Sequence, residues 1–98
     1  MTLPIIWTAP ARAQIAELYD YIAESSLSAA DHQVATIADS ANRLAIFSEI
    51  GRPGRRSGTR ELVIAGTPYI VVYRIRESTV RILAVMHGAQ RWPRMTSR

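Results

Sequence analysis

Three runs rich in β-branched and aromatic residues occupy the second half of the chain, and turns of only three residues separate them. The runs read RELVIA, YIVVYRI and TVRILAVMH, starting at Arg60, Tyr69 and Thr79, and the turns between them are GTP and RES. Each run has the length and composition of a β-strand. Connections this short can join only antiparallel neighbours, because a parallel pair needs a crossover of a dozen or more residues. The sequence therefore predicts a three-strand antiparallel meander around which every other element must pack.

The first half of the chain supplies one short strand and two amphipathic helices. The stretch LPIIWT reads as a strand, and Thr8 at its end can cap a helix that tolerates Pro10 in its first turn. A second helix is predicted to begin at a capping box formed by Ser28 and Asp31 and to end at Gly51. The apolar stripes of the two helices are Ile15, Leu18, Tyr19 and Ile22, then Val34, Ile37, Ala38, Ala41, Leu44 and Ala45. The predicted order is β-α-α-β-β-β, an α+β fold with a helical hairpin packed on one face of an antiparallel twisted sheet.

Alternation along the strands separates the two faces of the predicted sheet. The two hairpins are expected to pair Ile64 with Tyr69 and Ile75 with Val80. The face predicted to lie against the helices carries Leu62, Ile64, Tyr69, Val71, Tyr73, Ile75, Val80, Ile82, Ala84 and Met86. The opposite, mixed face is predicted to carry Glu61, Val63, Ile70, Val72, Arg74, Arg81, Leu83, Val85 and His87.

Two arginines are predicted to lie directly opposite each other on the mixed face. In this register Arg74 and Arg81 are cross-strand neighbours, and like charges in that position destabilise a sheet. Either Glu61 on the adjoining strand or an external anion should offset the repulsion. The apolar residues around the charges would leave a patch with no helical cover, and such patches usually mark partner sites.

Composition limits the class of protein. The chain has 98 residues and no cysteine, which indicates one domain over 1–98, with 1–2 and 94–98 as flexible ends, and excludes disulfides and thiolate metal sites. Neither a metal site nor a nucleotide cofactor is expected, since two distant histidines and no glycine-rich phosphate loop are present. The absence of a signal-peptide pattern and of a membrane-length apolar run predicts a cytoplasmic protein without membrane partners.

The basic residues are all arginine. Twelve arginines and eight acidic residues give a net charge of +4, which favours an anionic partner, although genome composition can also account for the arginine usage. Part of this charge falls in GRPGRRSGTR, residues 51–60, which is predicted to be a mobile loop without regular structure. The loop is either a solvated connection or a partner-binding segment through Arg52, Arg55, Arg56 and Arg60.

The element order, the stretch GRPGRRSGTRELVIAGTPYIVVYRI and the ending VRILAVMHGAQRWP resemble the RelE/ParE-superfamily toxins of bacterial type II toxin–antitoxin systems, also known as plasmid stabilisation proteins. The resemblance extends from Ile5 to Pro93. It implies growth inhibition that is neutralised by a cognate antitoxin with an acidic C-terminal segment, and operator DNA bound only through that antitoxin. It also implies one of two targets: DNA gyrase for ParE-like members, or mRNA in the ribosomal A site for RelE-like endonucleases.

The resemblance suggests different residues for the two activities. A RelE-like, metal-independent ribonuclease would use Glu61 or His87 as base or acid and Arg74 and Arg81 as a cationic clamp. The chain lacks lysine and has no tyrosine after His87, so the ending HGAQRWP favours a ParE-like gyrase inhibitor. The partner-binding residues would then include Arg91 and Trp92, unless the tryptophan instead covers the edge of the core. A generic nucleic-acid-binding module is the third possibility.

Overall fold

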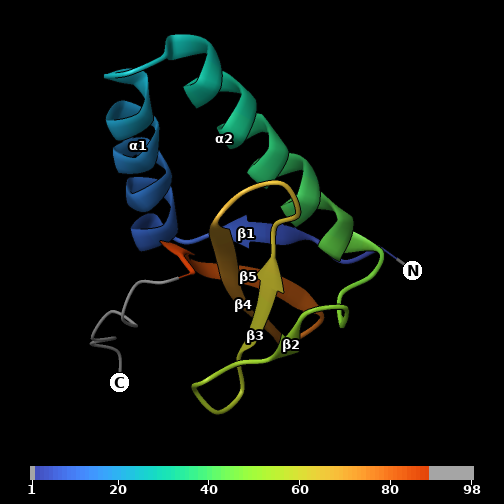
Figure 1. The fold of residues 1–98 in the computed structure, drawn as a ribbon. Coiled ribbons are helices and arrows are strands. Elements are labelled where there is room, and N and C mark those ends of the chain that lie inside the picture. The colour runs from blue at the N-terminus through green and yellow to red at the C-terminus, as the bar shows by residue number, and fades with distance from the viewer. Residues whose placement is uncertain (1, 89–98) are drawn as a thin grey trace.

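The computed structural model of the protein describes residues 2–88, and its elements follow the predicted order (Figure 1). The α+β architecture is confirmed, and a two-residue strand is added between the second helix and the meander. The elements are β1 (Ile5–Trp7), α1 (Ala9–Ala23), α2 (Leu27–Asn42), the 3-10 helix η1 (Arg43–Ala45), β2 (Arg52–Pro53), β3 (Arg60–Val63), β4 (Tyr69–Arg76) and β5 (Thr79–His87).

The sheet has the strand order β1-β5-β4-β3-β2. Both hairpins are antiparallel with the predicted registers, since the amide of Ile64 donates to the carbonyl of Tyr69 at 3.0 Å and Ile75 pairs with Val80. Strand β1 runs parallel to β5, with Ile5 opposite Val80, because the two helices carry the chain away before it returns as the meander. The sheet is therefore mixed rather than purely antiparallel.

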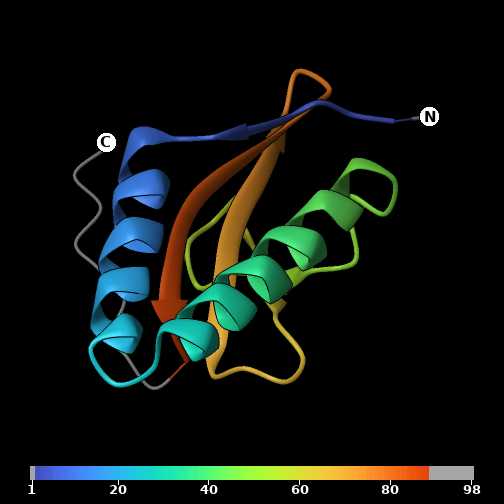
Figure 2. The same cartoon turned by 90° about the horizontal axis from the view of Figure 1, so that it is seen from above.

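Both helices cover the same face of the sheet (Figure 2). Helix α2 is capped by Ser26, whose hydroxyl accepts from the amide of Ala29 at 3.1 Å. The predicted box of Ser28 and Asp31 is wrong, because α2 begins at Leu27 and places the third amide of the helix within reach of Ser26. The carboxylate of Asp31 instead accepts a 2.7 Å hydrogen bond from Tyr19 and joins the two helices.

The main core fills the space between the helices and this face of the sheet. Its largest side chains are fully buried, and each large apolar side chain contributes roughly 1.5–3 kcal/mol to folding. The members include Ile37 and Leu44 from the helical layer and Ile64, Val71, Tyr73, Val80 and Ile82 from the sheet.

The segment after α2 is held by a tyrosine from the middle of the sheet. The hydroxyl of this residue, Tyr73, donates to the carbonyl of Ser48 at 2.7 Å and accepts from the amide of Gly51 at 2.9 Å. A side chain at Gly51 would lie 2.7 Å from the Tyr73 ring. The prediction that Gly51 ends the helix is therefore wrong, because α2 and η1 end by Ala45. The glycine allows the backbone to approach the ring.

A β-bulge in β5 changes which residues face the helices. Tyr73 pairs with Ile82 but Val72 pairs with Ala84, so Leu83 is an extra residue on β5. The face assignment is correct up to Ile82 and wrong beyond the bulge. Val85 and His87 lie on the helix-facing side, and Ala84 and Met86 lie on the opposite side.

Candidate partner-binding surface

The side of the sheet that faces away from the helices is here called the arginine face, defined by Arg52, Arg55, Glu61, Arg74 and Arg81. Cross-strand pairing arranges these residues in rows. One row joins Arg52 to Glu61 and continues to Val72 and Ala84, and another joins Ile6, Arg81 and Arg74.

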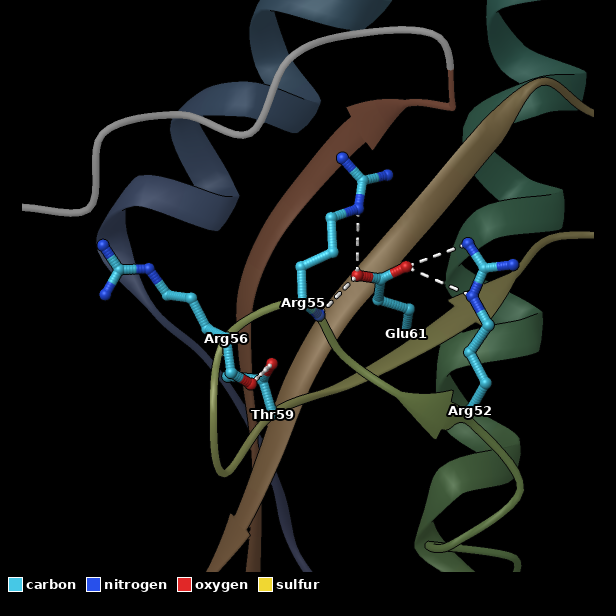
Figure 3. A network of polar contacts seen from close by, with 5 residues as sticks. All are labelled: Arg52, Arg55, Arg56, Thr59 and Glu61. Atoms are coloured by element: carbon cyan, nitrogen blue, oxygen red, sulfur yellow. Dashed lines mark hydrogen bonds and ion pairs between the residues drawn. The ribbon is translucent and has the colours of Figure 1, made fainter.

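Glu61 organises one end of the arginine face (Figure 3). One carboxylate oxygen accepts from Nη2 of Arg52 at 2.9 Å and from its Nε at 3.2 Å. The other oxygen accepts from the backbone amide of Arg55 at 3.1 Å and lies 3.5 Å from Nε of the same residue. Glu61 is only 3% exposed, so its charge is compensated almost entirely by these two arginines. Glu61 therefore forms an ion pair within its own row and with the segment before β3.

The same contacts give structure to the basic segment 51–60. Arg52 and Pro53 form β2 against β3, and the amide of Gly54 donates to the carbonyl of Thr59 at 2.8 Å, which closes the turn around Arg56. Thr59 also donates its hydroxyl to the carbonyl of Arg56 at 2.7 Å. The prediction of a loop without regular structure is therefore wrong at Arg52 and Pro53, where contacts to the buried Glu61 hold the chain on the sheet, and the mobility of the segment stays a prediction.

Arg74 and Arg81 form the next row of the arginine face, two residues along β4 from Val72, which pairs with Glu61. They are direct cross-strand neighbours on β4 and β5, as the sequence predicts. The Nε atom of Arg74 is buried and has no hydrogen-bond partner among the described residues. Glu61 is hydrogen-bonded and ion-paired to Arg52 and Arg55 rather than to either member of this pair. The sequence left open two ways of offsetting the repulsion, an ion pair with Glu61 or an external anion. The ion pair with Glu61 is not formed.

The apolar residues of the arginine face are less exposed than predicted. Ile70, Val72, Ala84 and Met86 form a second buried cluster, with Leu83 packed against it. The predicted open apolar patch is therefore wrong at these positions. The large apolar side chains that do remain exposed on this face of the described strands are Ile6, at 42%, and Val63, at 54%.

His87 lies on the other side of the sheet, next to α1. Its ring contacts the ring of Tyr69 edge to face, with centroids 5.7 Å apart. Gln14 and Tyr21 of α1 line the same hollow. The bulge at Leu83 causes this placement, and it separates the histidine from the arginine pair by the thickness of the sheet. The structure thus brings Glu61, Arg74 and Arg81 onto one face and places His87 on the other.

The remaining predicted binding residues do not lie together on the arginine face. Arg60 faces the helix side and donates to the carbonyls of Glu49 at 3.1 Å and Gly51 at 2.8 Å, so its guanidinium holds the segment after α2. Arg56 is exposed in the turn before β3 and has a partner within the chain. Arg91 and Trp92 lie outside the described residues.

Three tyrosines have raised pKa values. Burial raises the pKa of Tyr73, although the Gly51 amide and Arg60 oppose the shift, and burial also raises the pKa of Tyr69. The hydrogen bond to Asp31 raises the pKa of Tyr19. Since the ordinary value is already about 10, none of these phenols ionises near neutral pH to act as a base.

Sequence reasoning missed one structural polar residue. Gln14 on α1 accepts a 2.8 Å hydrogen bond from the amide of Val85, beyond the point where β1 stops pairing with β5. The glutamine thereby satisfies a strand amide that would otherwise lack a partner. A lone glutamine beside an apolar stripe gives no signal in the sequence for such a role.

Residues 2–88 contain neither a membrane-spanning helix nor a cluster of metal-ligating side chains. No helix in this part of the chain is both long and apolar enough to cross a bilayer. Over the same residues, histidine and acidic side chains do not gather in groups of three that could ligate a metal ion.

Comparisons with known proteins place this geometry in a family. Residues 5–92 match the family described as the ParE toxin of the type II toxin–antitoxin system parDE. Y4kP of Sinorhizobium fredii is 44% identical over 91 residues, covering 93% of this chain and 94% of that protein. The toxin RelE2 of Caulobacter vibrioides is 31% identical over 86 residues, covering 88% and 96% of the two chains.

Solved structures give the same result for the fold. The chromosomal ParDE system of P. aeruginosa superimposes with a TM-score of 0.80 at 24% identity, covering 88% of this chain and 96% of that one. The RelBE2 toxin–antitoxin complex of Mycobacterium tuberculosis gives 0.66 at 28% identity, covering 89% and 99%. With the family match over nearly the whole chain, the protein belongs to the ParE family of type II toxin–antitoxin toxins.

Proposed function

We propose that this toxin inhibits DNA gyrase by binding it, without catalysis, and that a cognate antitoxin with an acidic C-terminal segment neutralises it. The observation that carries the first part is the separation of the candidate catalytic groups. Cleavage of RNA through its 2′-hydroxyl needs a base, an acid and a cationic clamp around one phosphate. Here the histidine and the arginine pair lie on opposite faces of the sheet.

The acidic group of the same constellation is also poorly suited to proton transfer. Both oxygens of Glu61 accept hydrogen bonds from Arg52 and Arg55, and the side chain is 3% exposed. A general base must instead be within hydrogen-bond reach of a substrate hydroxyl. The described residues therefore favour a binding protein over a ribonuclease.

The antitoxin follows from the relatives and from charge. The ParDE and RelBE2 structures that this chain resembles are toxin–antitoxin systems. A net charge of +4 and an arginine face suit an acidic partner segment, which would order on binding. Contact with operator DNA would come through the antitoxin rather than through this chain.

A RelE-like ribonuclease is the second candidate. It is favoured by the 31% identity to the toxin RelE2 and by the opposed pair of Arg74 and Arg81, which resembles a phosphate clamp. It requires His87 or Glu61 to reach the same phosphate as that pair.

The two candidates are separated by testing purified toxin in a gyrase supercoiling assay and in a cleavage assay on ribosome-bound mRNA. We expect inhibition of supercoiling and no mRNA cleavage, and equal inhibition by His87→Ala, because that side chain has no catalytic role in a binding toxin. Added antitoxin should restore supercoiling. Cleavage of mRNA that His87→Ala abolishes, with gyrase unaffected, would establish the ribonuclease instead.

A further inference from the structure

The arginine pair on β4 and β5 has an unmet requirement for an anion. Arg74 and Arg81 are directly opposed, at the position where cross-strand like charges destabilise a sheet. Nε of Arg74 is in addition buried without an acceptor among the described residues. A buried donor left without an acceptor is costly, and more so when it carries charge.

The chain does not meet this requirement from its own nearby acidic residue. Glu61 is the acidic residue on the arginine face, and its two oxygens are already committed to Arg52 and Arg55. Arg52, Arg55 and Glu61 together carry about one net positive charge, and the two arginine side chains are about half exposed. Arg74 and Arg81 therefore form a separate cationic site and not an extension of the Glu61 network.

We propose that Arg74 and Arg81 form a receptor for one carboxylate side chain of an acidic, amphipathic partner segment. Under the proposed function that segment belongs to the antitoxin, and this identification rests on the proposed function. Nε of Arg74 is buried in the free protein, so the guanidinium must turn outward as the segment binds. It can then present Nε and one Nη to the two carboxylate oxygens, while Arg81 donates from the neighbouring strand. The bound carboxylate both removes the repulsion and provides the missing acceptor.

The surroundings favour a peptide over a nucleic acid. Ile6, 42% exposed, lies beside Arg81 in the same row, and Leu83 is partly exposed at the bulge. A segment that alternates acidic and apolar residues matches both kinds of contact. A nucleic-acid backbone needs a longer track of cations instead. Arg52 and Arg55 in the neighbouring row are paired with Glu61, and Arg76, on the same side of β4 as Arg74, lies at the end of the strand.

The test is an NMR titration of ¹⁵N-labelled full-length toxin, observed at the arginine Nε–H resonances. The probe is a short synthetic amphipathic peptide of glutamate and leucine, and the matched control peptide carries glutamine in place of glutamate. We expect the glutamate peptide to shift the Arg74 Nε–H resonance saturably, and the glutamine peptide to leave it unchanged. Poly(U) RNA serves as the nucleic-acid probe, and we expect no saturable shift with it.

Variants then locate the site. We expect Arg74→Gln and Arg81→Gln each to weaken glutamate-peptide binding about 10- to 100-fold, the range for losing a charge-assisted hydrogen bond. Arg74→Lys, which keeps the charge but lacks Nε, should lose most of the same affinity. Arg76→Gln is the control for nearby positive charge, because Arg76 is an exposed arginine on the same side of β4 as Arg74, and this variant should weaken binding far less.

Urea unfolding separates this role from a structural one. Since the pair is repulsive in the free protein, Arg81→Gln should unfold at no lower urea concentration than the wild type. The proposal is overturned if the glutamate peptide fails to shift Arg74, if Arg76→Gln weakens binding equally, if RNA shifts the resonance saturably, or if Arg81→Gln unfolds markedly earlier. None of these measurements involves gyrase, so this site and the proposed target can fail independently.

Discussion

Glu61→Gln is expected to destabilise the toxin by about 2 kcal/mol. The substitution keeps the shape and one acceptor oxygen, which can still serve Arg52. The new amide group, however, places a donor against the backbone amide of Arg55, which now lies 3.1 Å from a carboxylate oxygen. A buried donor left unsatisfied costs about 1–3 kcal/mol.

Losing the charge of Glu61 costs less stability than breaking a fully buried ion pair would. Breaking a buried pair costs about 3–5 kcal/mol, but the side chains of Arg52 and Arg55 are 55% and 48% exposed, so water screens most of their charge. The combined estimate therefore stays near 2 kcal/mol, and for a domain of this size it lowers the melting temperature by about 8–16 °C.

Urea unfolding followed by circular dichroism measures this loss, and amide hydrogen exchange at Arg55 reports whether the 54–59 turn detaches from the sheet. Glu77→Gln is the matched control, because Glu77 is exposed in the turn between β4 and β5, and it should change stability by less than about 0.5 kcal/mol. A loss for Glu61→Gln as small as that of the control would refute the view that this carboxylate holds the basic segment in place.

Two further predictions concern the contact between Tyr73 and the segment after α2. Tyr73→Phe removes the hydrogen bonds to Ser48 and Gly51 and should cost about 2 kcal/mol at neutral pH in urea unfolding. Because burial raises the folded-state pKa of Tyr73, the wild type keeps this contribution below about pH 10 and loses it as the pH rises through the folded value. The wild-type and Tyr73→Phe stabilities should therefore converge in alkaline solution, and curves that stay parallel would contradict the assignment. Gly51→Ala should cost about 1–3 kcal/mol in the same assay, since its Cβ would lie 2.7 Å from the Tyr73 ring; wild-type stability would show that the ring moves freely.

The strand pairing of this fold is available from the sequence because the turns are short. Three-residue connections leave no alternative to antiparallel neighbours, and they also fix the register of each hairpin near the turn, so the opposition of Arg74 and Arg81 follows from the position of the RES turn. The two helical stripes are equally clear, because their apolar residues recur at helical spacing.

The sequence carries no mark of the bulge. From Ile82 to Met86 every residue is apolar, so alternation cannot indicate which of them faces the helices. A single extra residue at Leu83 then changes the side of everything that follows, including His87. Strand β2 cannot be recognised in the sequence either, because it has only two residues and one of them is a proline. It is held on the sheet by the hydrogen bonds between Arg52 and Glu61 of the neighbouring strand.

The arginine face contains two arginines that are paired with a carboxylate and two that face each other, and this difference affects stability. Glu61 pairs with both Arg52 and Arg55, which fixes the 52–59 segment, whereas Arg74 and Arg81 remain opposed in the next row of the face. In a small domain, whose net stability is about 5–15 kcal/mol, the opposed pair is a cost to the free protein. A partner that supplies the missing carboxylate stabilises the folded toxin by mass action. The bound toxin should therefore resist unfolding more than the free toxin, and by a margin that shrinks in Arg74→Gln, since that variant no longer gains as much from the partner.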